Sequence, residues 1–283
     1  MRPEQISAKG TANGTAYSVY GAGEPLVLIH GVGMAQDAWT PQISELARDH
    51  RVIVYDMLGH GASRIPDEGV TLADYAAQLA GLLDHLGLPA ANVVGHSMGA
   101  LVALEFALTY PARTLRVAAL NAVFMRTPEQ QAAVLARAAT LQDIGVQATV
   151  DSTIARWFGD PVPTALQDSA RLVSGILARV HPQGYARTYR LFASCDRVHA
   201  DRLATLAMPA LFMTGEFDPN SSPSMSDAMA QRAPLATLDI VPGARHMMNM
   251  TDPQRINQGL QKFLAQPLAM PGTQRLTAPQ IAA

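Results

Sequence analysis

The chain has 283 residues, of which 48% are apolar and 16% are charged, and its formal net charge is −2. This length is sufficient for one large α/β domain with an insertion, and the small net charge offers little attraction for nucleic acid or an anionic membrane surface. No apolar run reaches the roughly 18 residues that a membrane-spanning helix needs. We therefore expect a small-molecule substrate, no nucleic-acid or membrane partner, and a monomer or homodimer.

The N-terminal half of the chain alternates predicted strands with predicted helices. Apolar or β-branched runs predict strands at 15–20, 25–29, 51–55, 91–94 and 115–120. Helices are expected at 39–48, at 71–86, where Thr71 and Asp74 form a capping-box pattern, and from residue 100. This alternation predicts a largely parallel sheet.

Two features of the sequence bear on its location. Residues 1–14 are polar and lack the apolar core of a secretory signal. The single cysteine, Cys195, cannot form an internal disulfide and is expected to be a small buried apolar residue. Both observations favour a reducing, cytoplasmic location.

The alternation stops after residue 124. Helical patterns without a convincing strand follow at 128–141, 147–158, 163–179 and 183–193. Strands are predicted again at 209–215 and 236–241, and a closing helix at 251–264. We therefore expect a core formed by 1–124 and 207–265, a helical cap of 125–206 that covers the active site, and a loose tail at 266–283.

The most specific motif is Gly95-His96-Ser97-Met98-Gly99, a G-x-S-x-G sequence between a predicted strand and a predicted helix. In this context the glycines permit a tight turn that presents the serine hydroxyl. The following helix begins with unpaired N–H groups that favour negative charge. We therefore predict Ser97 as a nucleophile and the Met98 amide as one donor to an oxyanion. The alternative is a glycine-rich turn in which Ser97 is an ordinary N-cap residue.

A nucleophilic serine needs a histidine base and an acid that orients this base. For a serine on a strand–turn–helix, the acid and then the histidine follow in chain order. Asp218 is the predicted acid, with Glu216 as the alternative, because both follow the strand at 209–215. His246, in the turn after the strand at 236–241, is the predicted base. The other position known for the acid, after the strand at 115–120, holds the uncharged Asn121.

The loop after the strand at 25–29 is expected to provide a second backbone donor to the oxyanion. Its sequence is His30-Gly31-Val32-Gly33-Met34. Val32 is the predicted donor and Gly33 the alternative, whereas His30 is expected to bond the loop backbone.

With these motifs in order, the chain resembles the α/β-hydrolase superfamily over about residues 14–264. The resemblance rests on His30-Gly31, on Asp56-Met57-Leu58-Gly59-His60-Gly61-Ala62-Ser63, on the G-x-S-x-G motif, on Gly215-Glu216-Phe217-Asp218 and on His246. It implies an α/β fold with a mostly parallel sheet of the eight-stranded type, flanked by helices, with the cap inserted between strands 6 and 7. One departure is Leu58, where arginine is common in the family, so that a salt bridge is missing. Segment 56–63 is expected to be a structural turn.

The cap suggests a narrower resemblance. Arg156-Trp157-Phe158 and the run 189–196 are similar to the 3-oxoadipate enol-lactonase branch, which hydrolyses small acidic lactones, and to hydrolases of ring-opened, carboxylate-bearing amides from N-heterocycle breakdown. Both groups imply an anionic substrate, which arginine can bind in a bidentate manner. The expected substrate contacts are Gly33, Trp157 and one or more of Arg126, Arg156, Arg187 and Arg190. Alternatively, the arginines are solvated helix-face charges and Trp157 anchors the cap.

The sequence therefore predicts a serine hydrolase that needs no metal or organic cofactor and cleaves an ester, lactone or amide through an acyl-enzyme. A haloperoxidase side activity and the hydrolysis of vinylogous C–C bonds are open to the same residues. A ligand sensor that retains the three residues is the alternative from another class, because fold does not determine function.

Overall fold

The computed structural model describes residues 6–268, with the side chains of 142–144 excepted. One eight-stranded sheet forms its centre, in the order β1-β2-β4-β3-β5-β6-β7-β8. The strands are β1 (Ile6–Ala12), β2 (Thr15–Tyr20), β3 (Glu24–Ile29), β4 (His50–Tyr55), β5 (Ala91–His96), β6 (Thr114–Leu120), β7 (Ala210–Gly215) and β8 (Ala236–Val241).

Strand direction brings several loops to one edge of the sheet. β2 runs antiparallel to β1 and to β4, whereas the strands β3 to β8 are mutually parallel. The register aligns Ile29 with Gly95, and Gly95 with Ala119. The carboxyl ends of β3, β5 and β6 therefore lie side by side, which is where open α/β sheets bind ligands. This is the α/β-hydrolase fold that the sequence predicts.

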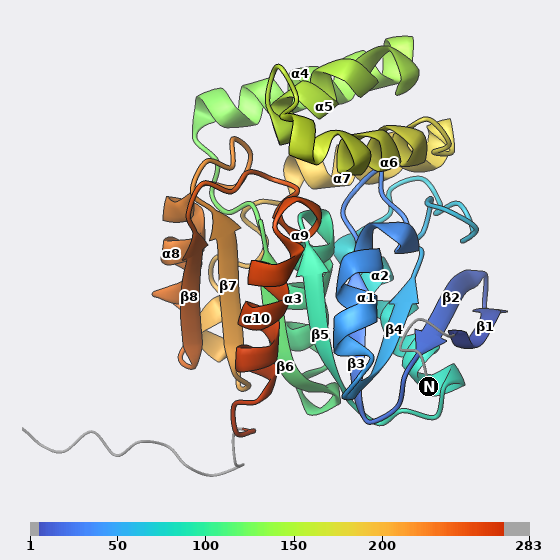
Figure 1. Cartoon of the computed structure of the whole chain (residues 1–283), viewed down its shortest axis with the longest axis vertical. Coiled ribbons are helices and arrows are strands. Elements are labelled where there is room, and N and C mark those ends of the chain that lie inside the picture. The colour runs from blue at the N-terminus through green and yellow to red at the C-terminus, as the bar shows by residue number, and fades with distance from the viewer. Residues whose placement is uncertain (1–5, 269–283) are drawn as a thin grey trace, which may run out of the picture.

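Both faces of the sheet are covered by helices (Figure 1). Within β3, Leu26 and Leu28 belong to the apolar cluster beneath α1 (Thr40–Leu46) and α10 (Pro253–Leu264). Val27 and Ile29 belong to the cluster beneath α2 (Leu72–His85) and α3 (Met98–Thr109). This alternation is the period of two that a strand buried on both faces requires. The helices of the core are α1 (Thr40–Leu46), α2 (Leu72–His85), α3 (Met98–Thr109), α8 (Pro223–Ala230), α9 (Met248–Thr251) and α10 (Pro253–Leu264).

The chain between β6 and β7 forms a helical cap at the carboxyl edge of the sheet (Figure 1). Its first helix begins with a capping box in which Thr127 and Gln130 bond each other's backbone N–H groups. The cap helices are α4 (Pro128–Ile144), α5 (Val150–Phe158), α6 (Gln167–Leu177) and α7 (Pro182–Ser194). No strand interrupts residues 125–206, in agreement with the sequence pattern.

The contacts between the cap and the core include a close approach of two glycines and an ion-pair cluster. Gly184 in the first turn of α7 lies against Gly59 so closely that a Cβ on Gly184 would come within 2.4 Å of Gly59 O. The segment after α7 is held by Glu105 of α3, whose carboxylate lies 3.0 Å from His199 Nε2 and 2.9 Å from Arg202 Nη1. The hydrogen bond from His199, together with those from Arg202 and Thr109, outweighs the effect of burial and lowers the pKa of Glu105 to about 2.

Some elements differ from those predicted. β1 was not predicted, because its side chains are mostly exposed and show no apolar period. α8 was not predicted either, and the stretch at 163–179 is a short 3₁₀ turn followed by α6. Of the predicted loose tail 266–283, residues 269–283 lie outside the described residues. No described helix is both long and apolar enough to cross a bilayer.

Candidate active site

Ser97 occupies the sharp turn between β5 and α3, as the G-x-S-x-G motif predicts. Its φ of 57° and ψ of −119° are strained for a residue with a side chain. Neither glycine position has room for a side chain. A Cβ on Gly95 would come within 2.0 Å of Gly99 O, and a Cβ on Gly99 would come within 2.3 Å of Ile29 O. Ser97 does not cap α3 with its side chain, so its hydroxyl is available to another group.

The predicted partners of Ser97 lie beside it. His246 Nε2 is 3.1 Å from Ser97 Oγ, and His246 Nδ1 is 2.8 Å from Asp218 Oδ2. A carboxylate only accepts, so Nδ1 carries the proton and Nε2 is free to accept from the serine hydroxyl. Glu216, the alternative acid, is exposed and accepts the N–H of Gly243 at 2.8 Å instead. The geometry therefore joins Ser97, His246 and Asp218 in one hydrogen-bonded chain.

Two further histidines, His30 and His96, are buried near this chain of residues. His30 donates from Nδ1 to Gly31 O at 2.8 Å and accepts the Met57 N–H at 3.0 Å, so that it bonds loop backbone as predicted. His96 Nε2 lies 2.8 Å from His246 O and thus supports the main chain of the predicted base. Burial lowers the pKa of His30 to about 4 and that of His96 to about 3. Both side chains are therefore neutral at pH 7 and act as fixed supports.

His60 distinguishes between the two predicted oxyanion donors of the loop after β3. Its Nε2 accepts the N–H of Gly33 at 2.9 Å, so this N–H already has an acceptor. Val32 N–H has no hydrogen-bond partner among the described residues. Met98 begins α3, and a first-turn N–H has no acceptor within its own helix. The pair Val32 and Met98 thus remains available.

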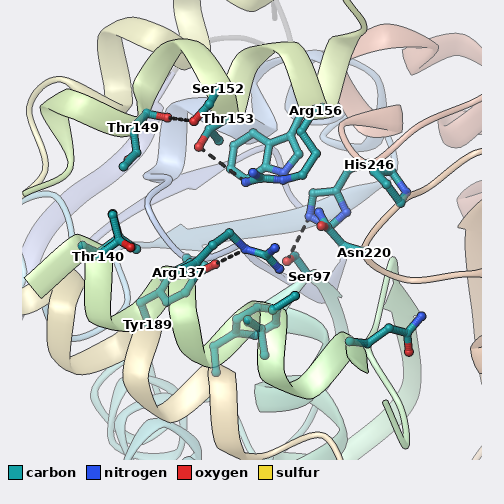
Figure 2. A pocket seen from close by; sticks show the side chains of 18 of the residues that line it. Ser97, Arg137, Thr140, Thr149, Ser152, Thr153, Arg156, Tyr189, Asn220 and His246 are labelled. Carbon is teal, nitrogen blue, oxygen red and sulfur yellow. Dashed lines mark hydrogen bonds between the residues drawn. The ribbon is translucent and has the colours of Figure 1, made fainter. Parts of the chain in front are cut away.

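A cavity of about 290 Å³ lies above Ser97 and His246, between the core and the cap. Figure 2 shows side chains that line it, with Arg137 beside Ser97 and Arg156 above Ser97 in this view. Among the residues that the structure describes, none of those lining the cavity is acidic. They are Val32, Ser97, Arg126, Gln130, Ala133, Val134, Arg137, Thr140, Leu141, Thr149, Ser152, Thr153, Arg156, Trp157, Tyr185, Tyr189, Phe192, Pro219, Asn220 and His246.

Comparison with known proteins agrees with this architecture. Residues 24–253 match the family described as the alpha/beta hydrolase fold. The chain belongs to the α/β-hydrolase family.

Curated members of the α/β-hydrolase family include relatives that span nearly all of this chain. It is 37% identical to an (E)-2-((N-methylformamido)methylene)succinate hydrolase of Acinetobacter baylyi, over 92% of this chain and 96% of that protein. It is 28% identical to 3-oxoadipate enol-lactonase 1 of the same organism, over 84% and 88%. The crystal structure of the enol-lactonase from Burkholderia xenovorans LB400 superposes with a TM-score of 0.82 at 25% identity, covering 92% of this chain and all of that one.

The cavity of this α/β-hydrolase contains two arginines that form no ion pair with a described residue. Within the described part of the chain, Arg156 donates only to Thr153 Oγ1, at 3.4 Å, and Arg137 only to Tyr189 Oη, at 3.3 Å. Burial, and to a smaller extent the charge of Arg137, lowers the pKa of Arg156. Two cations that share a partly dry cavity, with no counter-ion among the described residues, favour the binding of anions.

Three buried N–H groups around the same cavity have no partner among the described residues: Arg126 Nη2, Arg156 Nε and Trp157 Nε1. All three are donors, so a ligand that satisfies them must be rich in acceptor atoms.

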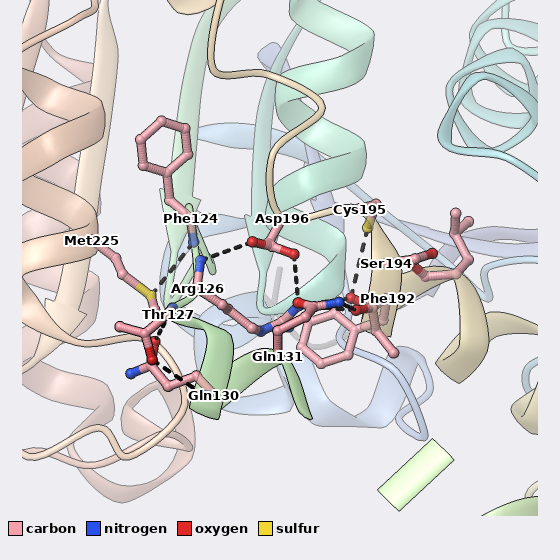
Figure 3. A network of polar contacts seen from close by, with 12 residues as sticks. Phe124, Arg126, Thr127, Gln130, Gln131, Phe192, Ser194, Cys195, Asp196 and Met225 are labelled. Atoms are coloured by element: carbon pink, nitrogen blue, oxygen red, sulfur yellow. Dashed lines mark hydrogen bonds and ion pairs between the residues drawn. The ribbon is translucent and has the colours of Figure 1, made fainter. Parts of the chain in front are cut away.

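Arg126 differs from the other two arginines because it is neutralised. Figure 3 shows its guanidinium and backbone bound to Asp196. Nη1 lies 3.3 Å from Asp196 Oδ1, and the Arg126 N–H lies 2.8 Å from Oδ2. The guanidinium also stacks on the ring of Phe192, 4.6 Å from its centroid. Arg126 therefore links the segment before α4 to the segment after α7, and its Nη2 amino group has no partner among the described residues.

Three expected substrate contacts differ in the structure. Arg190 is exposed on α7 and is not among the lining residues, because this position of the helix faces outward. Arg187 donates to Pro66 O at 2.6 Å and is likewise outside the lining. Gly33 is shielded by Tyr185: a Cβ there would come within 2.6 Å of Tyr185 Cε2.

Arg137 was not predicted as a site residue. It lies on α4, whose sequence shows no pronounced apolar face, so the pattern does not indicate which of its side chains face the core. Among the described residues, no group of three or more His, Cys, Asp or Glu side chains could hold a metal ion.

Proposed function

We propose that this α/β-hydrolase is a serine hydrolase that cleaves an ester, lactone or amide bond of a small dicarboxylate. The hydrogen-bonded chain supports the roles: Ser97 Oγ attacks the carbonyl carbon, His246 Nε2 takes the hydroxyl proton, and Asp218 orients His246 and stabilises the imidazolium. His246 then returns the proton to the leaving group. Water attacks the acyl-enzyme by the same route, which releases Ser97 and the acid product.

The oxyanion of each tetrahedral intermediate is assigned to the N–H groups of Val32 and Met98. Two backbone donors that need no reorganisation stabilise developing charge more in a desolvated site than in water. The assignment is supported by the free N–H of Val32 and by the position of Met98 at the N-terminus of α3.

The substrate's charge is inferred from one observation: the cavity beside Ser97 carries Arg137 and Arg156, and none of its described lining residues has a carboxylate. The two arginines come from different helices, α4 and α5, so each can bind a separate carboxylate. A single carboxylate would leave one of these cations without a counter-ion. A dicarboxylate of a few carbon atoms is therefore the substrate class that the cavity fits best.

The names of the relatives indicate which bond to test first. The relative with 37% identity is named for an amide-bearing methylenesuccinate, and another is named for an enol-lactone. We place the amide of an aminomethylene succinate first, because its two carboxylates match the two arginines. The enol-lactone of a keto-acid is the second candidate.

The test is a panel of small amides, enol-lactones and esters, each as the free dicarboxylate, the monomethyl ester and the dimethyl ester. The proposal expects kcat/KM to fall by roughly 10-fold or more with each carboxylate that is esterified, because each lost ion pair is worth about 1.4 kcal/mol or more. Mass spectrometry of a quenched reaction should detect an acyl group on Ser97. Preference for the dimethyl ester would indicate a general esterase, and a single turnover per protein would indicate a ligand sensor.

A further inference from the structure

Asn121, directly after β6, has a backbone conformation that few side chains tolerate. Its φ is 52°, in the left-handed region where Asn and Asp are enriched among residues other than glycine. The residue is fully buried. Its N–H donates to Met213 O at 2.8 Å, and its C=O accepts from Ser221 Oγ at 2.7 Å. Such strain persists only where the surroundings hold it, and it gathers at functional sites.

The side chain of Asn121 reaches Asp218. Nδ2 lies 2.7 Å from Asp218 Oδ2, the same oxygen that His246 Nδ1 contacts at 2.8 Å. Because an ionised carboxylate only accepts, the amide nitrogen must face Asp218. One carboxylate oxygen is thus shared by two N–H donors that arrive from β6 and from the turn after β8.

We infer that Asn121 is a positioning residue that acts on His246 through Asp218, an inference that rests on the proposed serine-hydrolase function. Its N–H fixes the direction of Oδ2 and withdraws part of the carboxylate's negative charge from His246. Asn121 occupies the position where an acid can stand in other serine hydrolases of this architecture. Here the amide instead supports an acid that comes from β7.

The electrostatics of Asp218 agree with this role. Burial raises the pKa of Asp218, but the charge of His246 and hydrogen bonds from His246, Asn121 and the Asn220 N–H outweigh it and hold the pKa below its ordinary value. Without the Asn121 N–H, more negative charge remains on Oδ2 and the protonated form of His246 is favoured. The acid limb of a kcat/KM profile should then move to higher pH.

The other titratable groups near Asp218 and His246 should not contribute to the acid limb of the kcat/KM profile. His96, on β5, has a ring centroid 5.1 Å from that of His246, and burial lowers its pKa to about 3. Burial likewise lowers the pKa of His30, after β3, to about 4. On the cap side, Arg156 lines the same cavity and stays charged.

Two substitutions at residue 121 are compatible with its backbone. Glycine tolerates a positive φ and removes the side chain, whereas aspartate also tolerates this φ and keeps the side-chain shape. Asn121→Gly should lower kcat about 10- to 100-fold and change KM less than about threefold. The acid limb of its kcat/KM profile should shift by about half a pH unit or more towards higher pH. Asn121→Asp should be most impaired at high pH and should recover relative to the wild type as pH falls, because the introduced carboxyl group can donate to Asp218 once it is protonated.

Ser221→Ala is the matched control, because it removes a hydrogen bond to Asn121 O and leaves the amide in place. It should lower the melting temperature without moving the pH profile. The inference is overturned if Asn121→Gly keeps the wild-type kcat, or if its kcat falls while its profile superposes on that of the wild type. If the glycine variant does not fold, a constant ratio of Asn121→Asp to wild-type activity across pH overturns it equally.

Asp218→Asn, measured in parallel, separates this inference from the proposed function. An inactive Asp218→Asn together with normal Asn121 variants would refute only the positioning role. A fully active Asp218→Asn would remove Asp218 from the proposed mechanism and the positioning role with it, whereas a fully active Ser97→Ala would refute the proposed function itself.

Discussion

The indole ring of Trp157 lies against the imidazole of His246, with ring centroids 5.4 Å apart and planes inclined by 36°. Trp157 belongs to cap helix α5, and His246 follows β8 of the core. The cap therefore contacts the proposed base directly and shields one face of it from water. Because charges interact more strongly where water is excluded, changes in the cap should affect kcat as well as KM.

Ser97→Ala should lower turnover by about 10⁴-fold or more, because groups that act as a unit fail together when one is removed. The fold should be preserved, since the hydroxyl does not cap α3. Steady-state assays on the best substrate of the panel, with circular dichroism of the variant, check both statements. A variant with near-normal rates would assign the chemistry to another group.

Asp218→Asn should cost roughly 10³- to 10⁴-fold in kcat, because a neutral amide no longer fixes the tautomer of His246. Glu216→Gln is the matched control and should change kcat only slightly, because Glu216 is exposed and bonds the backbone of Gly243. The reverse ranking of the two variants would move the acid to Glu216.

Arg137→Gln and Arg156→Gln should each remove the preference for one carboxylate of the substrate. The expected loss in kcat/KM on the dicarboxylate is about 10- to 1,000-fold, with hydrolysis of a neutral ester nearly unchanged. Arg190→Gln is the control, because Arg190 lies outside the cavity lining. If none of these variants alters the ratio of acid to methyl ester, the cavity does not select for charge.

The cluster of Glu105, His199, Arg202 and Thr109 should make the free energy of unfolding depend on pH in the acid range. The pKa of Glu105 is lowered from 4.5 to about 2 in the folded state. Its contribution is therefore fully present above about pH 4.5 and is lost as pH falls towards 2. Glu105→Gln should lower the melting temperature at pH 7, and its difference from the wild type should narrow below pH 4.5.

Calorimetry between pH 7 and pH 2.5 measures this narrowing. Glu45→Gln is the control, because Glu45 pairs with Arg48 at the surface, where ion pairs contribute little. A difference between Glu105→Gln and the wild type that stays constant over this range would contradict the assignment.

The sequence was sufficient for the parts of the site that depend on local geometry. Gly95 and Gly99 have no room for a side chain, so the turn that carries Ser97 is encoded in a few adjacent residues. Asp218 and His246 were found because parallel strands deliver their following loops to one edge of the sheet. The fold followed from the same alternation of strands and helices.

The parts that sequence did not reveal depend on how the cap is oriented. Arg137 and Arg190 both lie on amphipathic or mixed cap helices, and only tertiary packing turns the first towards Ser97 and the second outward. The N–H of Gly33 was the alternative prediction for an oxyanion donor, but it donates to His60, which lies on another loop. β1 was missed because an edge strand with exposed side chains carries no apolar period.

The four-helix part of the cap, α4 to α7, begins and ends at one place, because Met125 N–H donates to Asp196 O at 3.0 Å and the side chain of Asp196 binds Arg126. An insertion whose ends meet can change in length at little entropic cost to the sheet that carries it. The cap can thus be shortened, extended or exchanged between relatives while the strand order and the residues around Ser97 stay as they are. New substrate preferences can arise in such a lineage by replacing a single contiguous segment of the gene.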